Sequence, residues 1–395
     1  MNTPVSSPPR PRRGYLPLAP PCLGEDEVNA VVEVLRSGWL TTGPRVAAFE
    51  RAMAETIGVT EALALSSCTA ALHLSLAVAA IGPGDEVIVP SLTFAATANV
   101  VEHLGARPVF ADVLDDVLTL DPDDVARRIG PRTRAVIAVD YAGHPAELDA
   151  LRALCAARDL LFVEDAAHSL GASSGGRPVG VGGHPVAFSF YATKNLTTGE
   201  GGLLVADPAF LEKARPLALH GLSRDAYRRY ERGGPWSYAV LAPGYKYNMT
   251  DVAAALGLVQ LKRFAGFQER RRQLAALYHA RFADCPWLRR PVTRPGVESA
   301  HHLYPVRLVL EALDAERGTI LEELQERGIG ASVHFLPLHE QPYYRERYGY
   351  QPGDLPRTHE AGRRLLSLPF HPGLTDEDAE DVVAVVWDVL GRHRR

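Results

Sequence analysis

Short apolar runs alternate with segments of helical periodicity through the first half of the chain. The apolar runs predict strands at ALALSS, EVIVPS, RAVIAVD, LLFVEDA and VAFSFYA. Among these runs, TAALHLSLAVAAIG, TFAATANVVEHLG and ELDALRALCAARD have the apolar spacing of helices. Buried strands that alternate with helices are typical of βαβ units. We therefore expect an α/β fold with a mainly parallel, doubly wound sheet.

Two further helices frame this region. Residues 25–38, EDEVNAVVEVLRSG, carry apolar side chains at helical spacing and end at Gly38, a favourable helix C-cap. A longer helix is expected after GYKYNMTD, with Thr250 or Asp251 as N-cap and VAAALGLVQLKRF as its body. Its position predicts a bridge between two domains.

The pattern changes beyond this helix. HHLYPVRLVL and ASVHFLP predict strands, whereas TILEELQERG and TDEDAEDVVAVVWDVLG predict helices, which together indicate a smaller α+β module. The first residues are rich in Pro, Ser and Arg and offer little to bury. We predict a flexible tail over residues 1–14, a large α/β domain over 15–260 and a small C-terminal α+β domain over 261–395.

Composition and charge narrow the class of protein. The chain has 395 residues, with 42 Lys and Arg against 47 Asp and Glu, so its formal net charge is −5. This balance argues against nucleic acid or an anionic membrane as partner, because both favour a basic face. The four cysteines form no CxxC pair, and no apolar stretch has the length of a membrane span or signal-peptide core. We expect a cytoplasmic protein.

Polar residues that follow the predicted strands are the candidates for chemistry, because ligands of parallel sheets lie at the carboxyl ends of the strands. Cys68 and Thr69 open a helix after ALALSS, where free N–H groups favour an anion such as phosphate. Thr69 or a neighbouring serine is alternatively a simple helix cap. Asp165 and His168 follow LLFV, although acids at strand ends also cap loops.

Lys194 lies in SFYATKNLTTGEGGLL, between an apolar strand and a glycine-rich run. Partial desolvation in such a setting lowers the pKa of a lysine and makes its amine nucleophilic, as a Schiff base requires. A solvated surface lysine is the alternative. Ser189 precedes it and is a second candidate for holding a phosphate with Thr69.

Together these residues fit pyridoxal 5′-phosphate (PLP), which needs a lysine for its aldehyde, a carboxylate for its pyridine nitrogen and an anion site for its phosphate. Phe94, which follows the EVIVPS strand, is placed to cover the ring, or else belongs to the core. The pairs His301/His302 and His334/His339 have no carboxylate or cysteine at ligand spacing, so no metal site is expected.

The chain resembles the DegT/StrS-type family of PLP-dependent sugar aminotransferases. The matching segments include SGWLTTGPRVAAFE, VEDAAHSLGA, SFYATKNLTTGEGG, GYKYNMTDVAAALGLVQLKR and VHFLPLH, in the family's order. The resemblance implies a fold-type-I homodimer with the active site at the subunit interface. It assigns the Schiff base to Lys194 and the pyridine-nitrogen partner to Asp165. By the same resemblance, His168 lies beside the cofactor hydroxyl, Phe94 stacks on the ring, and Cys68, Thr69 and Ser189 hold the phosphate.

One segment departs from the common family pattern. Many members have GYNYRM where this chain has GYKYNM. The residue that reaches the neighbouring subunit's phosphate is then Lys246 by strict alignment, or Asn248 two positions later. Both alternatives stay open.

The resemblance implies that L-glutamate donates the amino group and that a nucleotide-linked keto sugar accepts it, most often a 4-keto-6-deoxyhexose or 4-keto pentose. A cyclitol ketone is an alternative acceptor. A non-catalytic regulatory member of the fold and a PLP-dependent sugar dehydratase are alternative functions, but relatives of the dehydratase type carry His in place of Lys194. The expected acceptor contacts are Trp39, Thr41, Thr42, Tyr191, His334 and Arg228, although Arg228 and its neighbours Arg224 and Arg229 equally fit a solvated loop.

Overall fold

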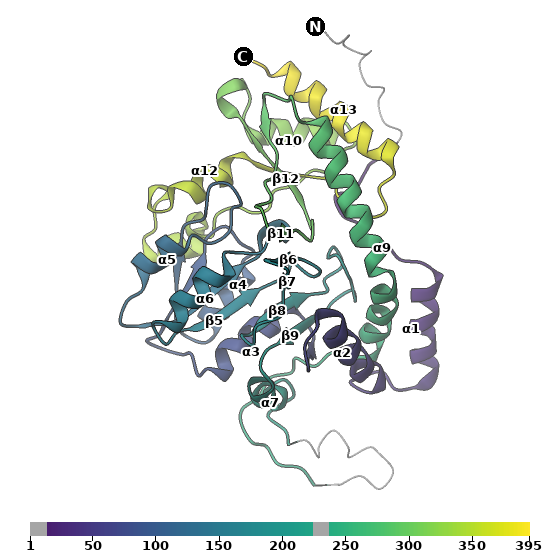
Figure 1. Cartoon of the computed structure of the whole chain (residues 1–395), viewed down its shortest axis with the longest axis vertical. Coiled ribbons are helices and arrows are strands. Elements are labelled where there is room, and N and C mark those ends of the chain that lie inside the picture. Colours follow the sequence, from purple (N-terminus) through teal and green to yellow (C-terminus); the bar gives the residue numbers. More distant parts are fainter. Residues whose placement is uncertain (1–13, 224–236) are drawn as a thin grey trace.

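A seven-stranded sheet forms the centre of the computed structural model, which describes residues 14–223 and 237–395 (Figure 1). Its strand order is β1-β9-β8-β5-β4-β2-β3. The strands are β1 (Leu63–Leu65), β2 (Glu86–Pro90), β3 (Arg107–Ala111), β4 (Thr133–Val139), β5 (Leu161–Asp165), β8 (Val186–Ser189) and β9 (Gly202–Val205). Strand β9 pairs antiparallel with β1 and β8, whereas β2, β3, β4, β5 and β8 are parallel. The predicted α/β fold with a mainly parallel sheet is confirmed.

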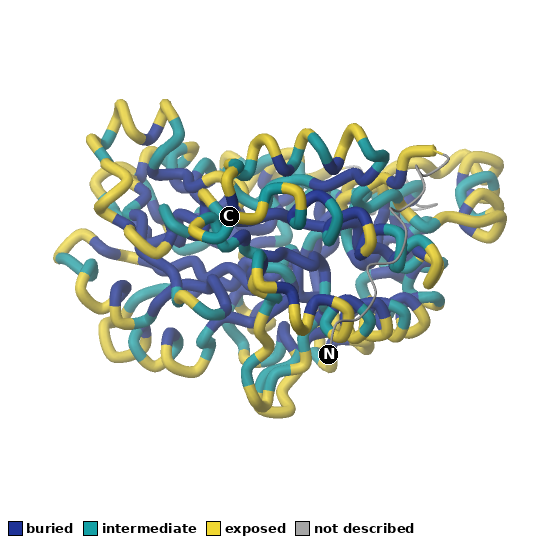
Figure 2. Tube along the Cα trace, turned by 90° about the horizontal axis from the view of Figure 1, so that it is seen from above, coloured by how far each residue is buried: buried dark blue, intermediate teal, exposed yellow. Residues whose placement is uncertain are grey.

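Helices cover both faces of this sheet because the strands bury side chains in both directions. On β2, Val87 and Val89 pack in one core with α3, α4 and α7, whereas Ile88 packs on the other face with α5 and α6. Figure 2 shows the buried chain running through the middle of the molecule. The helices of this part are α1 (Glu25–Ser37), α2 (Pro44–Ile57), α3 (Cys68–Val78), α4 (Ala96–His103), α5 (Pro122–Arg128), α6 (Leu148–Ala156) and α7 (Pro208–Leu217).

The sequence pattern missed strands β3 and β9. Strand β9 begins inside the glycine-rich run that follows Lys194, where the apolar stretch is short. Glycine is required at its first residue, since a Cβ on Gly202 would lie 2.2 Å from the carbonyl carbon of Ser67. The glycine therefore lets β9 pass close to the start of α3.

Helix α9 (Asp251–Arg281) joins the two parts of the molecule, as predicted. Thr250 is its N-cap, and the Thr250 hydroxyl accepts a hydrogen bond from the Ala253 N–H at 3.2 Å. Figure 1 shows α1 and α2 beside one end of α9 and α13 beside the other, and these helices contact it. The domain boundary expected at residues 260/261 falls inside this continuous helix, so the division into two domains stays a prediction. Residues 1–13 of the predicted tail lie outside the described part.

The C-terminal part packs a small sheet against helices. Strands β10 (Leu288–Arg289), β12 (Tyr304–Leu308) and β13 (Leu365–Leu368) form the sheet, and α10 (Arg317–Glu326), α11 (Pro342–Tyr348), α12 (Pro356–Arg364) and α13 (Asp376–Arg392) complete it. Strand β12, α10 and α13 match the predictions. The strand predicted at ASVHFLP is wrong: this segment makes a single bridge, from Ser332 to Ser367, before it turns toward the large sheet.

The remaining strands are β6 (Ser173–Ser174), β7 (Arg177–Pro178) and β11 (Val297–Glu298), which form a third small sheet. One strand of this sheet, β11, comes from the segment that follows α9, so the sheet ties that segment to the connection between β5 and β8. Among the described residues, no helix is long and apolar enough to cross a membrane.

Candidate active site

The expected site residues meet at one edge of the large sheet. Strands β5 and β8 are parallel neighbours and end at Asp165 and Ser189. Lys194 lies in the turn after β8, where its N–H donates to the Tyr191 carbonyl at 2.9 Å. Cys68 begins α3 directly after β1 and contacts Asp165. The topology thus brings together residues that lie more than 120 positions apart in the chain.

Asp165 is a buried carboxylate held by donors on both oxygens. Its Oδ2 accepts from the Thr97 hydroxyl at 2.8 Å, and its Oδ1 accepts from the Ala167 N–H at 3.3 Å. The Cys68 thiol lies 3.7 Å from Oδ1. Burial raises the pKa of Asp165, while these donors and the nearby Lys194 ammonium act in the opposite direction. Asp165 is therefore a buried acid suited to a cationic partner.

Lys194 is partly buried beside Asp165 and Cys68. Burial lowers the pKa of Lys194 to about 8, and the two acidic neighbours only partly oppose this shift. A fraction of the amine is thus neutral near neutral pH, which an ordinary surface lysine is not. The alternative of a solvated surface lysine is excluded.

Three imidazoles surround Lys194. His168 is buried and packs against His302, with ring centroids 4.4 Å apart and the ring planes tilted by 36°. Burial lowers the pKa of His168, His302 and His334, and the Lys194 ammonium lowers each further. The Nδ1 of His168 accepts from the Ala142 N–H at 3.3 Å, so the neutral ring carries its proton on Nε2. His168 therefore offers a neutral donor next to the lysine.

The start of α3 has the features of an anion site. Ser67, not Thr69, is the helix cap, because the Ser67 hydroxyl accepts from the Ala70 N–H at 3.1 Å. The Thr69 hydroxyl has no hydrogen-bond partner within the described residues, and the first N–H groups of a helix lack intrahelical acceptors. The Cys68 thiol points toward the Ala187 carbonyl, 3.4 Å away, and not toward this anion site. Cys68 can therefore bind a phosphate through its backbone N–H but not through its side chain. The Ser189 hydroxyl has one weak contact, from the Tyr191 N–H at 3.4 Å.

Aromatic side chains border this edge. Phe94 is 64% exposed, which excludes the alternative that it belongs to the core. Its ring lies 6.0 Å from that of Phe335, and Phe335 stacks on His168 at 5.9 Å. Tyr191 is 48% exposed in the turn before Lys194. These rings leave an open apolar surface beside the lysine.

His334 connects the C-terminal part to the site. Its Nδ1 lies 3.0 Å from the Ser367 hydroxyl, and its carbonyl accepts from the Tyr141 hydroxyl. His339 is buried elsewhere, with Nδ1 2.7 Å from the Ser91 hydroxyl. No group of three potential metal ligands occurs among the residues that the structure describes.

The other expected substrate and interface residues lie apart from Lys194 in this chain. The loop with Trp39, Thr41 and Thr42 is tied to the start of α9: the Trp39 indole donates to the Thr42 carbonyl at 3.1 Å, and the Asp251 N–H donates to the Leu40 and Thr41 carbonyls. No hydrogen bond or ring contact within the described chain joins this loop to the Lys194 cluster.

Asn248 and Lys246 differ in their contacts. The Asn248 amide donates to the Thr42 hydroxyl at 2.7 Å, and that hydroxyl donates to the Met249 carbonyl. Lys246 is exposed, and its ammonium has no partner in the described ranges. Arg228, with Arg224 and Arg229, lies outside the described residues.

Sequence reasoning missed the residues that support the cluster. Thr97 holds Asp165 and is itself 2.8 Å from the Thr93 hydroxyl, one helical turn earlier. Its signal was a threonine spaced four residues from another in SLTFAATAN. His302 and Asn195 had no signal of this kind, because their contacts join distant segments.

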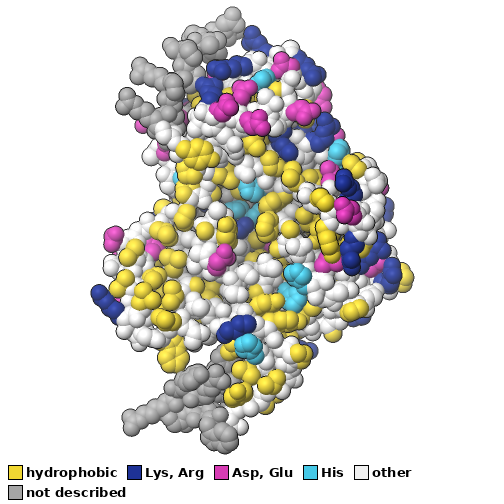
Figure 3. Space-filling model, turned by 180° about the vertical axis from the view of Figure 1, so that it is seen from behind, with side chains coloured by type: hydrophobic (Ala, Val, Ile, Leu, Met, Phe, Trp, Pro, Cys, Tyr) yellow, Lys and Arg dark blue, Asp and Glu magenta, His cyan; other side chains and the backbone are white. Residues whose placement is uncertain are grey.

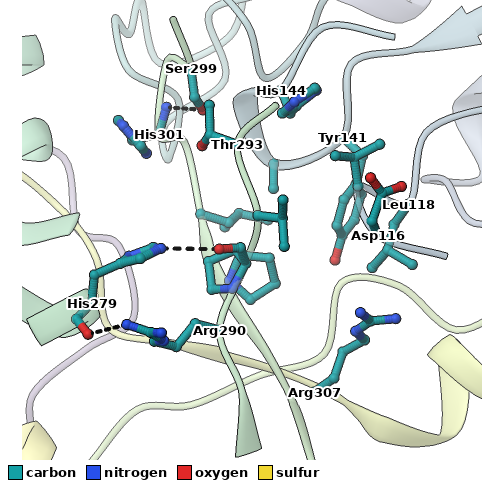
Figure 4. A pocket seen from close by; sticks show the side chains of 16 residues that line it. Asp116, Leu118, Tyr141, His144, His279, Arg290, Thr293, Ser299, His301 and Arg307 are labelled. Carbon is teal, nitrogen blue, oxygen red and sulfur yellow. Dashed lines mark hydrogen bonds between the residues drawn. The ribbon is translucent and has the colours of Figure 1, made fainter. Parts of the chain in front are cut away.

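A second hollow lies behind the cluster and is lined by Tyr141, Ala142, His144, His279, Arg290, His301 and Arg307, among others (Figure 4). It contains none of the residues expected to bind the cofactor. Tyr141 and Ala142 separate this hollow from the Lys194 cluster, since Tyr141 contacts His334 and Ala142 contacts His168.

Comparison with known proteins identifies the family. The sequence profile of the DegT/DnrJ/EryC1/StrS aminotransferase family matches residues 21–387. The chain belongs to this family. It is 43% identical over 381 residues to the spore coat polysaccharide biosynthesis protein SpsC of Bacillus subtilis, which covers 96% of this chain and 98% of SpsC. An uncharacterized protein of Methanocaldococcus jannaschii, MJ1066, is also 43% identical, over 97% of this chain and all of its own length.

Solved structures of the family have the same fold. The PMP form of a putative sugar aminotransferase, Spr1654 from Streptococcus pneumoniae, superposes with a TM-score of 0.89 at 33% identity, over 96% of this chain and 98% of that one. PseC of Helicobacter pylori, an aminotransferase involved in pseudoaminic acid biosynthesis, has a TM-score of 0.87 at 31% identity, over 96% of this chain and all of PseC.

The protein is therefore a PLP-dependent sugar aminotransferase of fold type I. The residues present fit this cofactor: a buried carboxylate, a lysine with lowered pKa, and an unpartnered hydroxyl beside free helix N–H groups lie together at the end of the sheet. Family membership and the intact Lys194 also argue against the regulatory and dehydratase alternatives.

Proposed function

We propose that this enzyme transfers the amino group of L-glutamate to a nucleotide-linked keto sugar, a 4-keto-6-deoxyhexose or a 4-keto pentose. The observation that carries the proposal is that Lys194 and Asp165 lie close enough to shift each other's pKa. A lysine whose pKa is about 8 lies beside a buried carboxylate at the end of adjacent parallel strands. The similarity to SpsC and PseC, proteins of polysaccharide and sugar biosynthesis, supports a sugar acceptor.

Asp165 is suited to pair with the protonated pyridine nitrogen. When bound, PLP supplies an electron sink that stabilises negative charge at the donor's α-carbon. The Thr97 hydroxyl and the Ala167 N–H favour the ionised form of the Asp165 carboxylate, against the effect of its burial, and orient it. Thr69, Ser189 and the N–H groups of α3 would hold the phosphate.

Lys194 performs the proton transfers. Its neutral amine takes the proton from the donor's α-carbon, and its ammonium returns the proton, because a pKa near 8 allows both forms near neutral pH. The neighbouring imidazoles are neutral, so they do not suppress the ammonium form of Lys194 as a cation would. His168 donates through Nε2 toward the cofactor hydroxyl.

Phe94 would cover the ring of the bound cofactor, and the acceptor would lie beside the exposed ring of Tyr191, with His334 at its side. Dimer formation would complete the site, with the exposed Lys246 of one subunit reaching the phosphate of the other. Asn248 is less suited to this role because its amide is already bonded to Thr42.

Two half-reactions test the proposal separately. The purified holoenzyme is mixed with L-glutamate, and the visible cofactor band is followed; we expect the band to disappear. Nucleotide-linked 4-keto sugars carrying UDP, dTDP or GDP are then added, and we expect one of them to restore the band.

The outcomes have distinct meanings. An unchanged band with L-glutamate would contradict the donor. Loss of the band that only a cyclitol ketone restores would contradict the nucleotide-sugar acceptor while leaving the donor in place. Lys194→Ala is the matched control and should give no response at either step.

A further inference from the structure

The segment Ala300–His302 lies between the lysine cluster and the hollow of Figure 4. His301 has a positive φ of 45°, and its ring lines the hollow, whereas the ring of the next residue, His302, packs against His168. The segment is fixed to the loop behind it, since the N–H groups of Ala300 and His302 donate to the carbonyls of Gly143 and Ala142 at 2.9 and 3.0 Å. The two backbone segments lie so close together that residue 143 must be glycine, because a Cβ there would lie 2.7 Å from the His301 backbone nitrogen.

Asn195, the residue after Lys194, is held by this segment. Its Nδ2 donates to the Ala300 carbonyl at 2.8 Å and to the Gln268 side chain at 3.0 Å. The backbone carbonyl fixes which end of the amide is the nitrogen, so Asn195 Oδ1 is an acceptor. His302 Nδ1, 3.0 Å from Oδ1, must then carry a proton and donate. All polar atoms of the buried Asn195 amide are thus paired.

Arg271 anchors the segment from α9. Its guanidinium is buried, and Nη1 donates to the carbonyls of His301, His302 and Phe370 at 3.1, 3.0 and 3.3 Å. No carboxylate pairs with it within the described residues. Burial alone lowers the pKa of Arg271, to about 9. Burying a cation without a counter-ion costs free energy, and the hydrogen bonds to these carbonyls offset part of that cost. Moving the backbone would break them, so the segment is held in one arrangement.

We propose that His302 and Asn195 are positioning residues for the proton transfers of Lys194. The His302–Asn195 hydrogen bond fixes the backbone from which the Lys194 side chain extends, and the His302 ring fixes the plane of His168. Lys194 must leave and rejoin the cofactor during each turnover, so its backbone has to stay in place while its side chain moves. The inference rests on Lys194 being the reacting lysine and on no particular acceptor.

A double-mutant cycle tests this role. His302→Phe keeps an aromatic ring against His168 but removes the donor, and Asn195→Ala removes the acceptor. Each variant is loaded with PLP, and the rate of band loss with saturating L-glutamate is measured by stopped flow. We expect each single variant to be slower by about 10- to 100-fold, because small misplacements of a reacting group cost this much. The double variant should be no slower than the slower single one, since both remove the same contact.

Readouts other than turnover separate positioning from general damage. The pH at which the visible band of the PLP-loaded protein titrates should shift in both single variants. The shift in the double variant should equal the shift in a single variant, because all three proteins lack the same contact. His302→Gln, whose amide N–H can donate to Asn195, should recover part of the rate, because it restores the hydrogen bond but not the ring against His168. Gln273→Ala is the matched control and should behave as wild type. Gln273 lies on the exposed side of α9, the helix that carries Gln268 and Arg271.

Additive effects in the cycle, or an unshifted band in both single variants, would overturn the proposal. If His302→Phe does not fold, Asn195→Ala and Asn195→Leu decide it, because both remove the oxygen that accepts from His302 Nδ1. Wild-type rates and band titration in these two would overturn it. Wild-type protein that forms the visible band but does not react with L-glutamate would instead contradict the donor of the proposed function.

Discussion

The chemistry of individual residues follows from how the fold buries charge. Lys194 and Asp165 are both removed from water, and burial shifts their pKa values toward each other, downward for the lysine and upward for the acid. The sequence was sufficient to select both residues, since each follows an apolar strand. It was not sufficient to find Thr97 or His302, because their roles depend on which distant segments the fold brings into contact.

Capture of PLP by the cofactor-free protein should depend on pH through Lys194. Only the neutral amine attacks an aldehyde, so the capture rate should rise about tenfold per pH unit below the pKa of about 8 and level off above it. Asp165→Asn removes a negative charge that holds this pKa up, and should therefore move the midpoint to lower pH. The measurement is stopped-flow absorbance across pH 6 to 10 in both proteins. A midpoint near the ordinary lysine value of 10.5 would contradict the burial of Lys194.

The site residues lie at the ends of secondary-structure elements. Strands β5 and β8 deliver Asp165 and Ser189, and the start of α3 delivers Thr69. Apolar periodicity predicted these elements because each buries a continuous hydrophobic run. It failed at ASVHFLP, where residues that favour strands lack a partner strand along most of their length. This segment instead brings His334 into contact with Tyr141.

Helix α9 begins at a cap that the sequence alone predicted. Thr250→Ala removes the acceptor for the Ala253 N–H and should lower the free energy of unfolding by about 1 kcal/mol. Thr56→Ala is the control: its exposed hydroxyl donates to the Ala52 carbonyl within α2, and its loss should have little effect. Urea denaturation followed by circular dichroism measures both. Equal stability of Thr250→Ala and wild type would show that the cap contributes nothing.

At the scale of the whole molecule, exposed apolar side chains suggest a larger assembly. Leu23, Val28, Leu35, Trp39 and Leu40 are each between 38% and 56% exposed, near α1 and the loop that follows it. Figure 3 shows hydrophobic side chains over much of one face, with histidines toward its middle. Such surfaces commonly mark protein interfaces, which agrees with the proposed homodimer.

Mixing two inactive variants tests whether subunits share a site. Lys194→Ala and Lys246→Ala should each lose glutamate reactivity as pure proteins. After the two are unfolded and refolded together, half of the dimers are mixed, and each contains one intact site, so about a quarter of wild-type activity should return. Asn248→Ala in place of Lys246→Ala is the comparison. No recovery in the Lys246 mixture would contradict the proposal that Lys246 acts across the interface.

The most direct test of the account is to identify the lysine that binds PLP. The chain has four lysines, Lys194, Lys213, Lys246 and Lys262, so the assignment is discrete. The PLP-loaded protein is reduced with borohydride, digested and mapped by mass spectrometry. We predict a pyridoxyl label on the peptide that contains Lys194 and its loss in Lys194→Ala. A label on any of the other three lysines, or none at all, would contradict the site described for this enzyme.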